Sequence, residues 1–353
     1  MDELTLNTIK VIIPTTVAFF AGIALTPILS HYLYKNKLWK KKSVAKALDG
    51  RDAPITAKLH GDEERKTPRM GGILVWAVSF LTITFFSIYA LLDGEIAQKL
   101  SFFSRNQTWL PLFTLIVGGL IGLIDDFLVV NDKFDYFAGG MSLTKRLAVV
   151  FVVSIIGAWW FYVKLDTTNI VIPFWGELEM GLYFIPFFIL VMLGTYSGGI
   201  IDGIDGLSGG IFSIIFSAYG IIAFAQNQID LSAFCFTVVG ALLAFLWFNI
   251  PPARFFLSDT GTMSLTLTLT VIAFLTEQVV VFPIIAFPLV MASGSTTIQL
   301  LSKKFRNGKK VFLVAPIHHH FQAKGWPAYK VTMRFWVIGI IFALLGVVLA
   351  LIG

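Results

Sequence analysis

The sequence predicts an all-α integral membrane protein, a polytopic bundle of about ten transmembrane helices with both termini outside. The composition is 56% hydrophobic and only 14% charged, with mean hydropathy +0.80, which is too apolar for a soluble globular domain. Apolar segments of spanning length recur from one end of the chain to the other, and lysine and arginine gather in alternate loops between them.

Each predicted helix is an apolar run long enough to cross the hydrocarbon core, which needs roughly 20 residues. Some runs contain proline, but neighbouring helices can satisfy the backbone groups that proline leaves open in a membrane bundle. The eighth and ninth runs nearly adjoin, so nine spans is an alternative count. The predicted spans are residues 11–33, 70–92, 110–130, 147–163, 182–201, 207–225, 231–250, 262–276, 279–301 and 333–352.

The distribution of positive charge predicts which side of the membrane each loop faces. The loops at 34–69, 131–146, 251–261 and 302–334 hold 23 of the 27 Lys and Arg residues. Because basic loops face the cytoplasm, these loops are expected inside and both termini outside. The net charge of +6 is therefore a one-sided cytoplasmic excess that suits membrane lipid head groups or an anionic substrate, and no nucleic-acid partner is expected.

Two adjacent carboxylates, Asp125 and Asp126, end the third predicted span in Gly-Leu-Ile-Asp-Asp-Phe. Ionisable groups at membrane depth are costly, so a functional role is the first hypothesis. They could ligate Mg²⁺, which prefers hard oxygen atoms and bridges to substrate phosphates, or one of them could act as a general base. The alternative is a solvated helix end, although the apolar residues 127–130 continue the run.

Further carboxylates stand on the same predicted face of the membrane. Asp259, just before the eighth span, is either a helix N-cap or a ligand of a shared Mg²⁺. The segment Ile-Asp-Gly-Ile-Asp-Gly-Leu at 201–207 joins the fifth and sixth spans. Its glycines let the backbone approach a ligand closely, and its carboxylates could accept hydrogen bonds from a nucleobase or sugar. A tight turn is the equal alternative.

Two segments rich in cations and imidazoles complete this face. Arg65-Lys66-Thr67-Pro68-Arg69-Met70-Gly71-Gly72 opens the second span with charges that oppose the helix dipole, which indicates an anionic partner, although the positive-inside bias also explains them. His318, His319 and His320 follow a basic run and precede the last span. Such a cluster suits a site for anions, or for a metal with phosphate. Together these features predict polyphosphate chemistry, which needs mainly positioning and charge stabilisation.

On these motifs the chain resembles the polyprenyl-phosphate phosphosugar transferases of cell-envelope synthesis, as a divergent member. The similarity runs essentially end to end, from Thr-Pro-x-Met-Gly-Gly at 67–72 to the last span. It is most specific in Ala-Pro-Ile-His-His-His-Phe-Gln-Ala-Lys-Gly-Trp-Pro at 315–327. The resemblance implies a single transferase domain over residues 1–353. It also implies a homodimer in the cytoplasmic (inner) membrane of a bacterium, with its active site facing the cytoplasm.

The reaction implied by the resemblance converts UDP-N-acetylmuramoyl-pentapeptide and undecaprenyl phosphate into lipid I and UMP, with Mg²⁺ as cofactor. The implied catalytic residues are Asp125, Asp126, Asp259, His318, His319 and His320, with Asp259 as the metal ligand. The implied substrate-binding residues are Lys66, Arg146, Gly203, Ile204, Asp205, Asn249 and Phe256, with Phe256 stacking on uracil. Lys145 is the alternative to Arg146, because the register of that loop is ambiguous.

The chain departs from the family's usual pattern around this core. Tyr196 and Gly199 replace two asparagines before the 201–207 segment, Val129 replaces a lysine after the Asp pair, and Arg69 ends a segment that usually reads Lys-x-Gly-Thr-Pro-Thr. Ala292 replaces a glutamate, and Leu257-Ser258 replaces Met-Gly. These departures motivate one alternative, the same chemistry with another UDP-sugar donor such as UDP-N-acetylglucosamine. A separate alternative is a transporter of lipid-linked sugars, which would need charged residues within spans or internal repeats. The sequence indicates neither feature, because the carboxylates cluster at one face.

Overall fold

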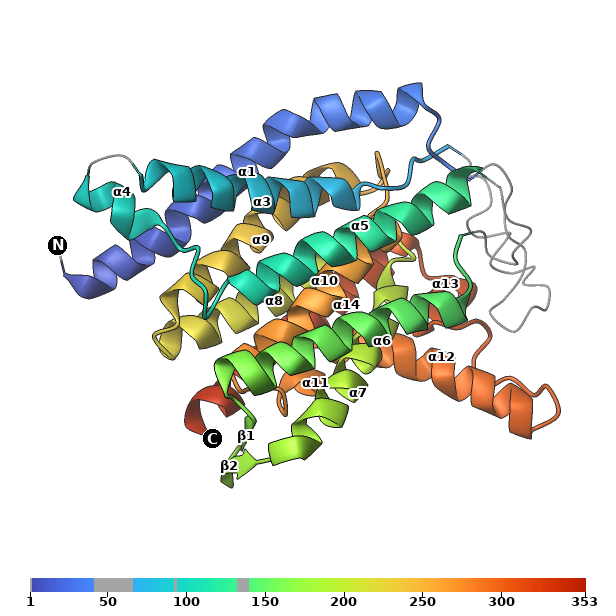
Figure 1. The fold of residues 1–353 in the computed structure, drawn as a ribbon. Coiled ribbons are helices and arrows are strands. Elements are labelled where there is room, and N and C mark those ends of the chain that lie inside the picture. The colour runs from blue at the N-terminus through green and yellow to red at the C-terminus, as the bar shows by residue number, and fades with distance from the viewer. Residues whose placement is uncertain (1, 41–65, 92–93, 132–139) are drawn as a thin grey trace.

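The computed structural model describes residues 2–40, 66–91, 94–131 and 140–353, and these residues form a bundle of helices with one small hairpin (Figure 1). The prediction of an all-α polytopic membrane protein is confirmed. The helices are α1 (Glu3–Lys35), α3 (Gly72–Tyr89), α4 (Glu95–Leu100), α5 (Trp109–Asn131), α6 (Leu143–Trp159), α7 (Phe184–Ser197), α8 (Leu207–Ala225), α9 (Ile229–Asn249), α10 (Ser258–Leu275), α11 (Phe282–Ile285), α12 (Phe287–Phe305), α13 (Ile317–Ala323) and α14 (Ala328–Ile352).

Among the described residues, eight helical segments are long and apolar enough to cross a membrane. They are Glu3–Lys35, Gly72–Tyr89, Trp109–Asn131, Leu143–Leu165, Gly181–Ile201, Leu207–Ala225, Ile229–Asn249 and Ala328–Ile352. Each overlaps one of the predicted spans, and the largest difference is at the first helix, which begins at Glu3 where the predicted span begins at residue 11. The orientation of the bundle across a membrane stays a prediction.

The two remaining predicted spans have a different character. The run at 262–276 corresponds to α10, whose serines, threonines and glycine lower its hydropathy and whose residues are almost all buried. Small residues of this kind let helices approach closely within membranes. The run predicted at 279–301 is wrong as one continuous helix, because the chain breaks between α11 and α12. Each of these helices has proline in its first turn, where the ring is tolerated, and α12 extends beyond the apolar run to Phe305.

A two-stranded antiparallel sheet, absent from the predicted elements, joins α6 to α7. After α6 the chain continues through a π-helical turn at Trp160–Leu165 and then forms β1 (Asn169–Ile172) and β2 (Gly176–Glu179). Asn169 pairs with Glu179, and Ile172 pairs with Gly176. Figure 1 places this hairpin at the same end of the bundle as both termini. The end of α5, which carries Asp125 and Asp126, and the short helix α13, which carries the three histidines, lie at the opposite end.

The packing of α5 on α10 fixes the position of the carboxylates. Glycines at positions 118 and 122 of α5 face α10 across a distance too short for side chains. A β-carbon at Gly118 would lie 2.9 Å from the carbonyl oxygen of Met263, and one at Gly122 would collide with the carbonyl of Asp259. Glycine spaced by four residues permits such close contact between membrane helices. One turn beyond Gly122, α5 carries the Asp pair.

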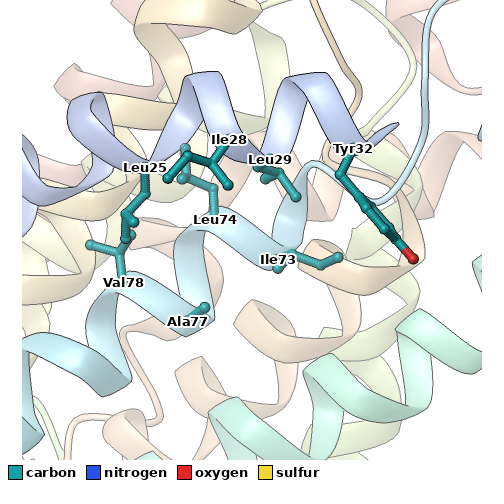
Figure 2. Close-up of a pocket in the computed structure, with 8 residues that line it drawn as sticks. All are labelled: Leu25, Ile28, Leu29, Tyr32, Ile73, Leu74, Ala77 and Val78. Atoms are coloured by element: carbon teal, nitrogen blue, oxygen red, sulfur yellow. The ribbon is translucent and has the colours of Figure 1, made fainter. Parts of the chain in front are cut away.

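A groove of about 320 Å³ runs between α1 and α3. Figure 2 shows side chains from both helices lining it, with the Tyr32 hydroxyl at one end. The lining residues are Leu25, Ile28, Leu29, Tyr32, Ile73, Leu74, Ala77 and Val78. This almost wholly apolar lining suits hydrocarbon and offers little to a nucleotide. None of the predicted site residues belongs to it.

Candidate active site

Three carboxylates converge where the end of α5 meets the start of α10. Asp125 and Asp126 lie on α5 and are fully buried, so the alternative of a solvated helix end is wrong. Asp259 lies in the first turn of α10, which begins at Ser258. Leu257 occupies the N-cap position of this helix, so the N-cap alternative for Asp259 is also wrong. A carboxylate in the first turn is still favoured by the helix dipole.

Asp126 is held by an unusually complete set of hydrogen bonds. Its Oδ2 atom accepts from the Ser258 hydroxyl at 2.5 Å, from the Thr260 backbone N–H at 2.9 Å and from the Thr260 hydroxyl at 2.6 Å. Its Oδ1 atom accepts from Nε of Arg69 at 2.9 Å. Because both oxygen atoms are engaged by protein groups, this side chain orients its neighbours and has little capacity left for a ligand.

Asp125 has a different environment from the residue next to it. Its Oδ1 atom accepts from the backbone N–H of Met141 at 2.5 Å, and its Oδ2 atom lies 2.6 Å from Nη2 of Arg146. Gly140 precedes this contact with φ +78°, and a β-carbon there would lie 2.8 Å from Asp125 Oδ1. Glycine is therefore required at residue 140, both for its conformation and for its closeness to the carboxylate.

Two arginines clamp Asp259 between them. Nη2 of Arg69 lies 3.4 Å from Asp259 Oδ2, and Nη1 of Arg146 lies 3.4 Å from Asp259 Oδ1. Each arginine also contacts one member of the Asp pair, at 2.9 Å for Arg69 and 2.6 Å for Arg146. Burial alone would lower the pKa of Arg69, but Asp126 and Asp259 raise it above its ordinary value. Arg69 therefore stays cationic at any pH the protein meets.

The backbone around Arg69 is fastened to the segment that precedes α10. Phe256 N–H donates to the Pro68 carbonyl at 2.9 Å, and Gly71 N–H donates to the Phe256 carbonyl at 2.8 Å. Met70 N–H donates to the Ser258 hydroxyl at 2.8 Å. Met70 adopts φ +68°, which is uncommon for a residue with a side chain. This turn directs Arg69 toward Asp126 and Asp259.

The histidine segment meets the loop at 201–207. A β-carbon at Gly203 would lie 2.7 Å from Nε2 of both His318 and His319, so glycine makes room for these imidazoles. Next to it, Asp202 accepts from the Ser258 backbone N–H at 2.7 Å and from the Ser208 hydroxyl at 2.6 Å. Since Ser258 also bonds Asp126, a continuous chain of contacts links the histidines to the carboxylates. Burial raises the pKa of Asp202, and these hydrogen bonds oppose that shift.

Asn249 and Asp205 brace the same loop from its other side. Asn249 is buried, accepts from Gly206 N–H at 2.9 Å and donates to the Phe255 carbonyl at 2.8 Å. Asp205 Oδ2 accepts from the Ala253 N–H at 2.9 Å. The tight-turn interpretation of the 201–207 segment is partly correct, because Leu207 N–H donates to the Ile204 carbonyl at 3.0 Å. Asp202 and Asp205 hold backbone N–H groups outside this turn.

The three histidines are positioned by polar side chains of α12. The hydroxyl of Ser295 accepts from Ile317 N–H at 2.9 Å, at the start of α13. Gln299 accepts from Val311 and Phe312 N–H and donates to the Phe312 carbonyl. Within the histidine segment, His320 Nδ1 accepts from Leu313 N–H at 3.1 Å, and His319 Nδ1 lies 2.8 Å from Gln322 Oε1.

Comparison with known proteins places this arrangement in a family. The glycosyl transferase family 4 model matches residues 108–277, which include the Asp pair, Arg146, the 201–207 loop and Asp259. A phospho-N-acetylmuramoyl-pentapeptide-transferase of Listeria innocua is 32% identical over 292 residues, covering 82% of this chain and 86% of that protein. A protein of the same name from Chloroflexus aurantiacus is 36% identical over 303 residues, covering 81% and 77%. The chain belongs to the phospho-N-acetylmuramoyl-pentapeptide-transferase family.

Not every predicted substrate-binding residue of this family member lies at the carboxylates. Lys66 is exposed, whereas Arg146 contacts two of the carboxylates and the adjacent Lys145 points away into an exposed position. Phe256 is half-buried beside the turn that holds Arg69, and Ile204 is buried next to Gly203. The geometry therefore favours Arg146 over Lys145, and the role of Lys66 stays a prediction.

Two residues that are not among the predicted site residues belong to the cluster. Arg69 bonds two carboxylates, and the Tyr196 side chain lies against Arg146 and near Asp259. The signal for Arg69 is its place in a cationic segment, with one residue between it and a Gly-Gly pair at a helix start. No sequence pattern predicts that Tyr196 belongs to the site, because a tyrosine within an apolar span is ordinary.

The residues fit a magnesium ion held mostly by the substrate. Mg²⁺ usually binds one or two carboxylates and completes its shell with water and phosphate oxygens. Asp259 suits this role, because its side chain is 21% exposed and its contacts to the arginines are long. Within the described residues, no three His, Cys, Asp or Glu side chains are grouped as a metal cage. A site with one carboxylate, finished by phosphates, agrees with that geometry.

Proposed function

We propose that residues 1–353 form one transferase domain that joins phospho-N-acetylmuramoyl-pentapeptide to undecaprenyl phosphate, with release of UMP and formation of lipid I. The observation that carries this proposal is the convergence of Asp125, Asp126 and Asp259 with Arg69 and Arg146 at one end of a membrane bundle. The family relationship supports the same reaction. The domain would lie in the bacterial cytoplasmic membrane with this end facing the cytoplasm.

The chemistry is a phosphoryl transfer between two anionic substrates. A phosphate oxygen of undecaprenyl phosphate attacks the phosphorus that carries the sugar, a new P–O bond forms, and the bond to the oxygen of UMP breaks. Such reactions depend on positioning and on neutralising charge. Mg²⁺ on Asp259 would neutralise phosphate charge when bound. Arg146 adds a fixed positive charge, and Asp125 holds that arginine in place through its 2.6 Å contact.

The loops around the carboxylates supply the substrate-binding surface. Gly203, Ile204, Asp205, Asn249 and Phe256 form one connected group, in which Asn249 holds the 206 and 255 backbones together. We assign this group to the uridine of the donor and the half-buried Phe256 ring to stacking on uracil. His318, His319 and His320 are assigned to substrate phosphates, and Lys66 to the rim. Asp126 acts by positioning Arg69 and the start of α10.

One observation favours a second candidate for the UDP-sugar substrate. Tyr196 lies against Arg146, where its phenol occupies space beside the transfer site. The same chemistry with another UDP-sugar, such as UDP-N-acetylglucosamine, is therefore the second candidate. A panel of UDP-sugar donors distinguishes the two by their kcat/KM values.

The proposed function is tested by UMP release from purified protein in detergent. Wild-type protein should release UMP from UDP-N-acetylmuramoyl-pentapeptide only when undecaprenyl phosphate and Mg²⁺ are both present. Asp259→Asn should reduce kcat at least about 100-fold, because a ligand and its charge are lost. Near-normal turnover by that variant would remove the metal assignment, and no release from any UDP-sugar would remove the function.

A matched control is available at the other end of the bundle. Asp230 lies in the first turn of α9, as Asp259 lies in the first turn of α10, and its side chain is 23% exposed. Its ion pair with Lys10 is partly exposed, so Asp230→Asn should leave turnover within about twofold. The proposed homodimer is tested separately, by the mass of the detergent-solubilised protein in light scattering.

A further inference from the structure

Arg69 lies among the carboxylates, but the proposed reaction assigns it no contact with a substrate. Its side chain is 17% exposed, and its guanidinium bonds Asp126 through Nε and Asp259 through Nη2. Arginine has five N–H donors in a planar fork. In the part of the chain that the structure describes, these two carboxylates account for the contacts of the guanidinium, so donors are left over for a ligand.

The two contacts of Arg69 differ in strength. Its Nε lies 2.9 Å from Asp126, within the range of charge-assisted hydrogen bonds, but its Nη2 lies 3.4 Å from Asp259, beyond that range. Arg146 repeats the pattern, with 2.6 Å to Asp125 and 3.4 Å to Asp259. Each arginine is therefore anchored on a fully buried carboxylate and only loosely held by Asp259.

The charges of the cluster explain why a loosely held arginine is useful when a phosphate approaches. Three carboxylates share two guanidinium groups, so both cations already have carboxylate partners before a phosphate arrives. A guanidinium that leaves Asp259 and turns to phosphate oxygens replaces one anionic partner with another. It loses no strong bond in doing so. Arginine is suited to this exchange, because its planar fork matches the spacing of phosphate oxygens.

The backbone keeps the base of the side chain in place during such an exchange. Arg69 N–H donates to the Leu38 carbonyl at 2.8 Å, and the residues on either side of it bond to Phe256 and Ser258. Asp126 then fixes Nε. The planar guanidinium then has only to pivot about Nε as a rigid group, which carries its outer nitrogen atoms from Asp259 toward a phosphate.

We propose that Arg69 is a phosphate-binding residue of the transfer site, which exchanges its Asp259 contact for the diphosphate of the nucleotide donor. This inference rests on the proposed function, because it names a further binding residue for the same reaction. It identifies the ligand by its chemistry, a nucleoside diphosphate, which needs a cation that stays charged and presents parallel N–H groups.

The test compares Arg69→Gln, Arg69→Lys and the control Arg254→Gln in UMP release and in calorimetric binding of UDP. Arg254 is an exposed arginine in the neighbouring loop, with its guanidinium over the Phe248 ring. Arg69→Gln should weaken UDP binding and lower kcat/KM for the donor by about 10- to 150-fold, the range for a lost charge-assisted hydrogen bond. Arg69→Lys should fall between that variant and wild type, because it keeps the charge and loses the fork. The control should match wild type.

Wild-type UDP affinity and kcat/KM in both Arg69 variants would overturn the inference. If Arg69→Gln does not fold, because Asp126 loses its cation, Arg69→Lys decides the question on the same two measurements. Failure of the proposed function looks different. In that case wild-type protein releases no UMP from any donor, while the UDP affinities of wild type and variants still report on Arg69.

Discussion

Gly203 packs so closely under His319 that a β-carbon on residue 203 would lie 2.7 Å from the Nε2 atom of that imidazole. The same β-carbon would lie equally close to Nε2 of His318. The loop at 201–207 and the histidine segment are more than a hundred residues apart in the chain, and a single missing methyl group lets them meet. The position of the two imidazoles therefore depends on residue 203.

Replacing Gly203 by alanine should displace both imidazoles while leaving the bundle folded. Misplacing groups at a reacting centre by about 1 Å costs on the order of 100-fold in rate, so kcat/KM for UMP release should fall by about that factor. The matched control is Gly194→Ala in α7, where a β-carbon would meet nothing within 4 Å. Equal activity of the two variants would show that the contact at residue 203 has no functional weight.

The substitution Gly122→Ala should destabilise the protein by separating α5 from α10. Its β-carbon would collide with the Asp259 carbonyl, and overpacking of this kind costs about 1–3 kcal/mol. The midpoint of thermal unfolding in detergent should therefore fall by several degrees. Gly294→Ala in α12 introduces the same methyl group where a β-carbon has no neighbour within 4 Å, so its midpoint should stay at the wild-type value.

The substitution Thr260→Val should impair catalysis, because it removes a hydroxyl group that donates a hydrogen bond to the buried Asp126. The Thr260 hydroxyl lies 2.6 Å from Asp126 Oδ2, and losing a partner of a buried charge costs about 1–3 kcal/mol or more. We expect a lower unfolding midpoint and at least a tenfold loss of kcat, with Thr260→Ser close to wild type. Thr270→Val on the same helix removes only a hydroxyl bonded to the Thr266 carbonyl, and it should be nearly neutral. Similar losses in both valine variants would mean that the effect is not specific to Asp126.

Acidification should release the backbone of Leu313 from the histidine segment. His320 Nδ1 accepts from Leu313 N–H, so the contact requires Nδ1 without a proton. Burial, together with Lys324, lowers the pKa of His320 below its ordinary value. A lowered pKa means that the contact is fully present above the ordinary pKa of about 6.5 and is lost as the pH falls through the folded value.

Hydrogen exchange measured by mass spectrometry, corrected for intrinsic rates, checks this pH dependence on peptides that cover residues 309–317. Protection at Leu313 should decrease in wild type as the pH falls below the ordinary histidine pKa of about 6.5. In His320→Asn the side-chain oxygen can still accept the N–H, and protection should not change with pH over that range. If protection of Leu313 in the wild type does not change with pH, the assignment of His320 Nδ1 as an acceptor is contradicted.

Much of the fold could be predicted because apolar length and charge bias leave a membrane chain few alternatives. The eight spanning segments were all anticipated, since each is an uninterrupted apolar run. The interruption between α11 and α12 was missed, although Pro283 and Pro288 stood in the sequence. In a membrane bundle proline is tolerated within helices as well as at their starts, so the residues alone do not distinguish a continuous helix from a broken one.

The site was predictable where a residue type is out of place and unpredictable where it is not. Asp125 and Asp126 are conspicuous in an apolar run, and three consecutive histidines are conspicuous anywhere. Arg69 looked like one more cation in a basic loop. Its contact with Asp126 follows from the turn at Met70 and from the hydrogen bonds of Gly71 and Phe256, which are tertiary features. Ion pairs between helices depend on such details of backbone direction.

The hydroxyl of Ser302, near the end of α12, donates to the Lys309 carbonyl at 2.9 Å and closes the turn that follows this helix. The contacts that hold the histidines, from Ser295 and Gln299, all lie on the histidine side of this closure. Residues 303–308, the last turn of α12 and the turn after it, thus lie on the other side of this closure from the histidines. We expect a probe attached to this turn to leave the histidine segment in place.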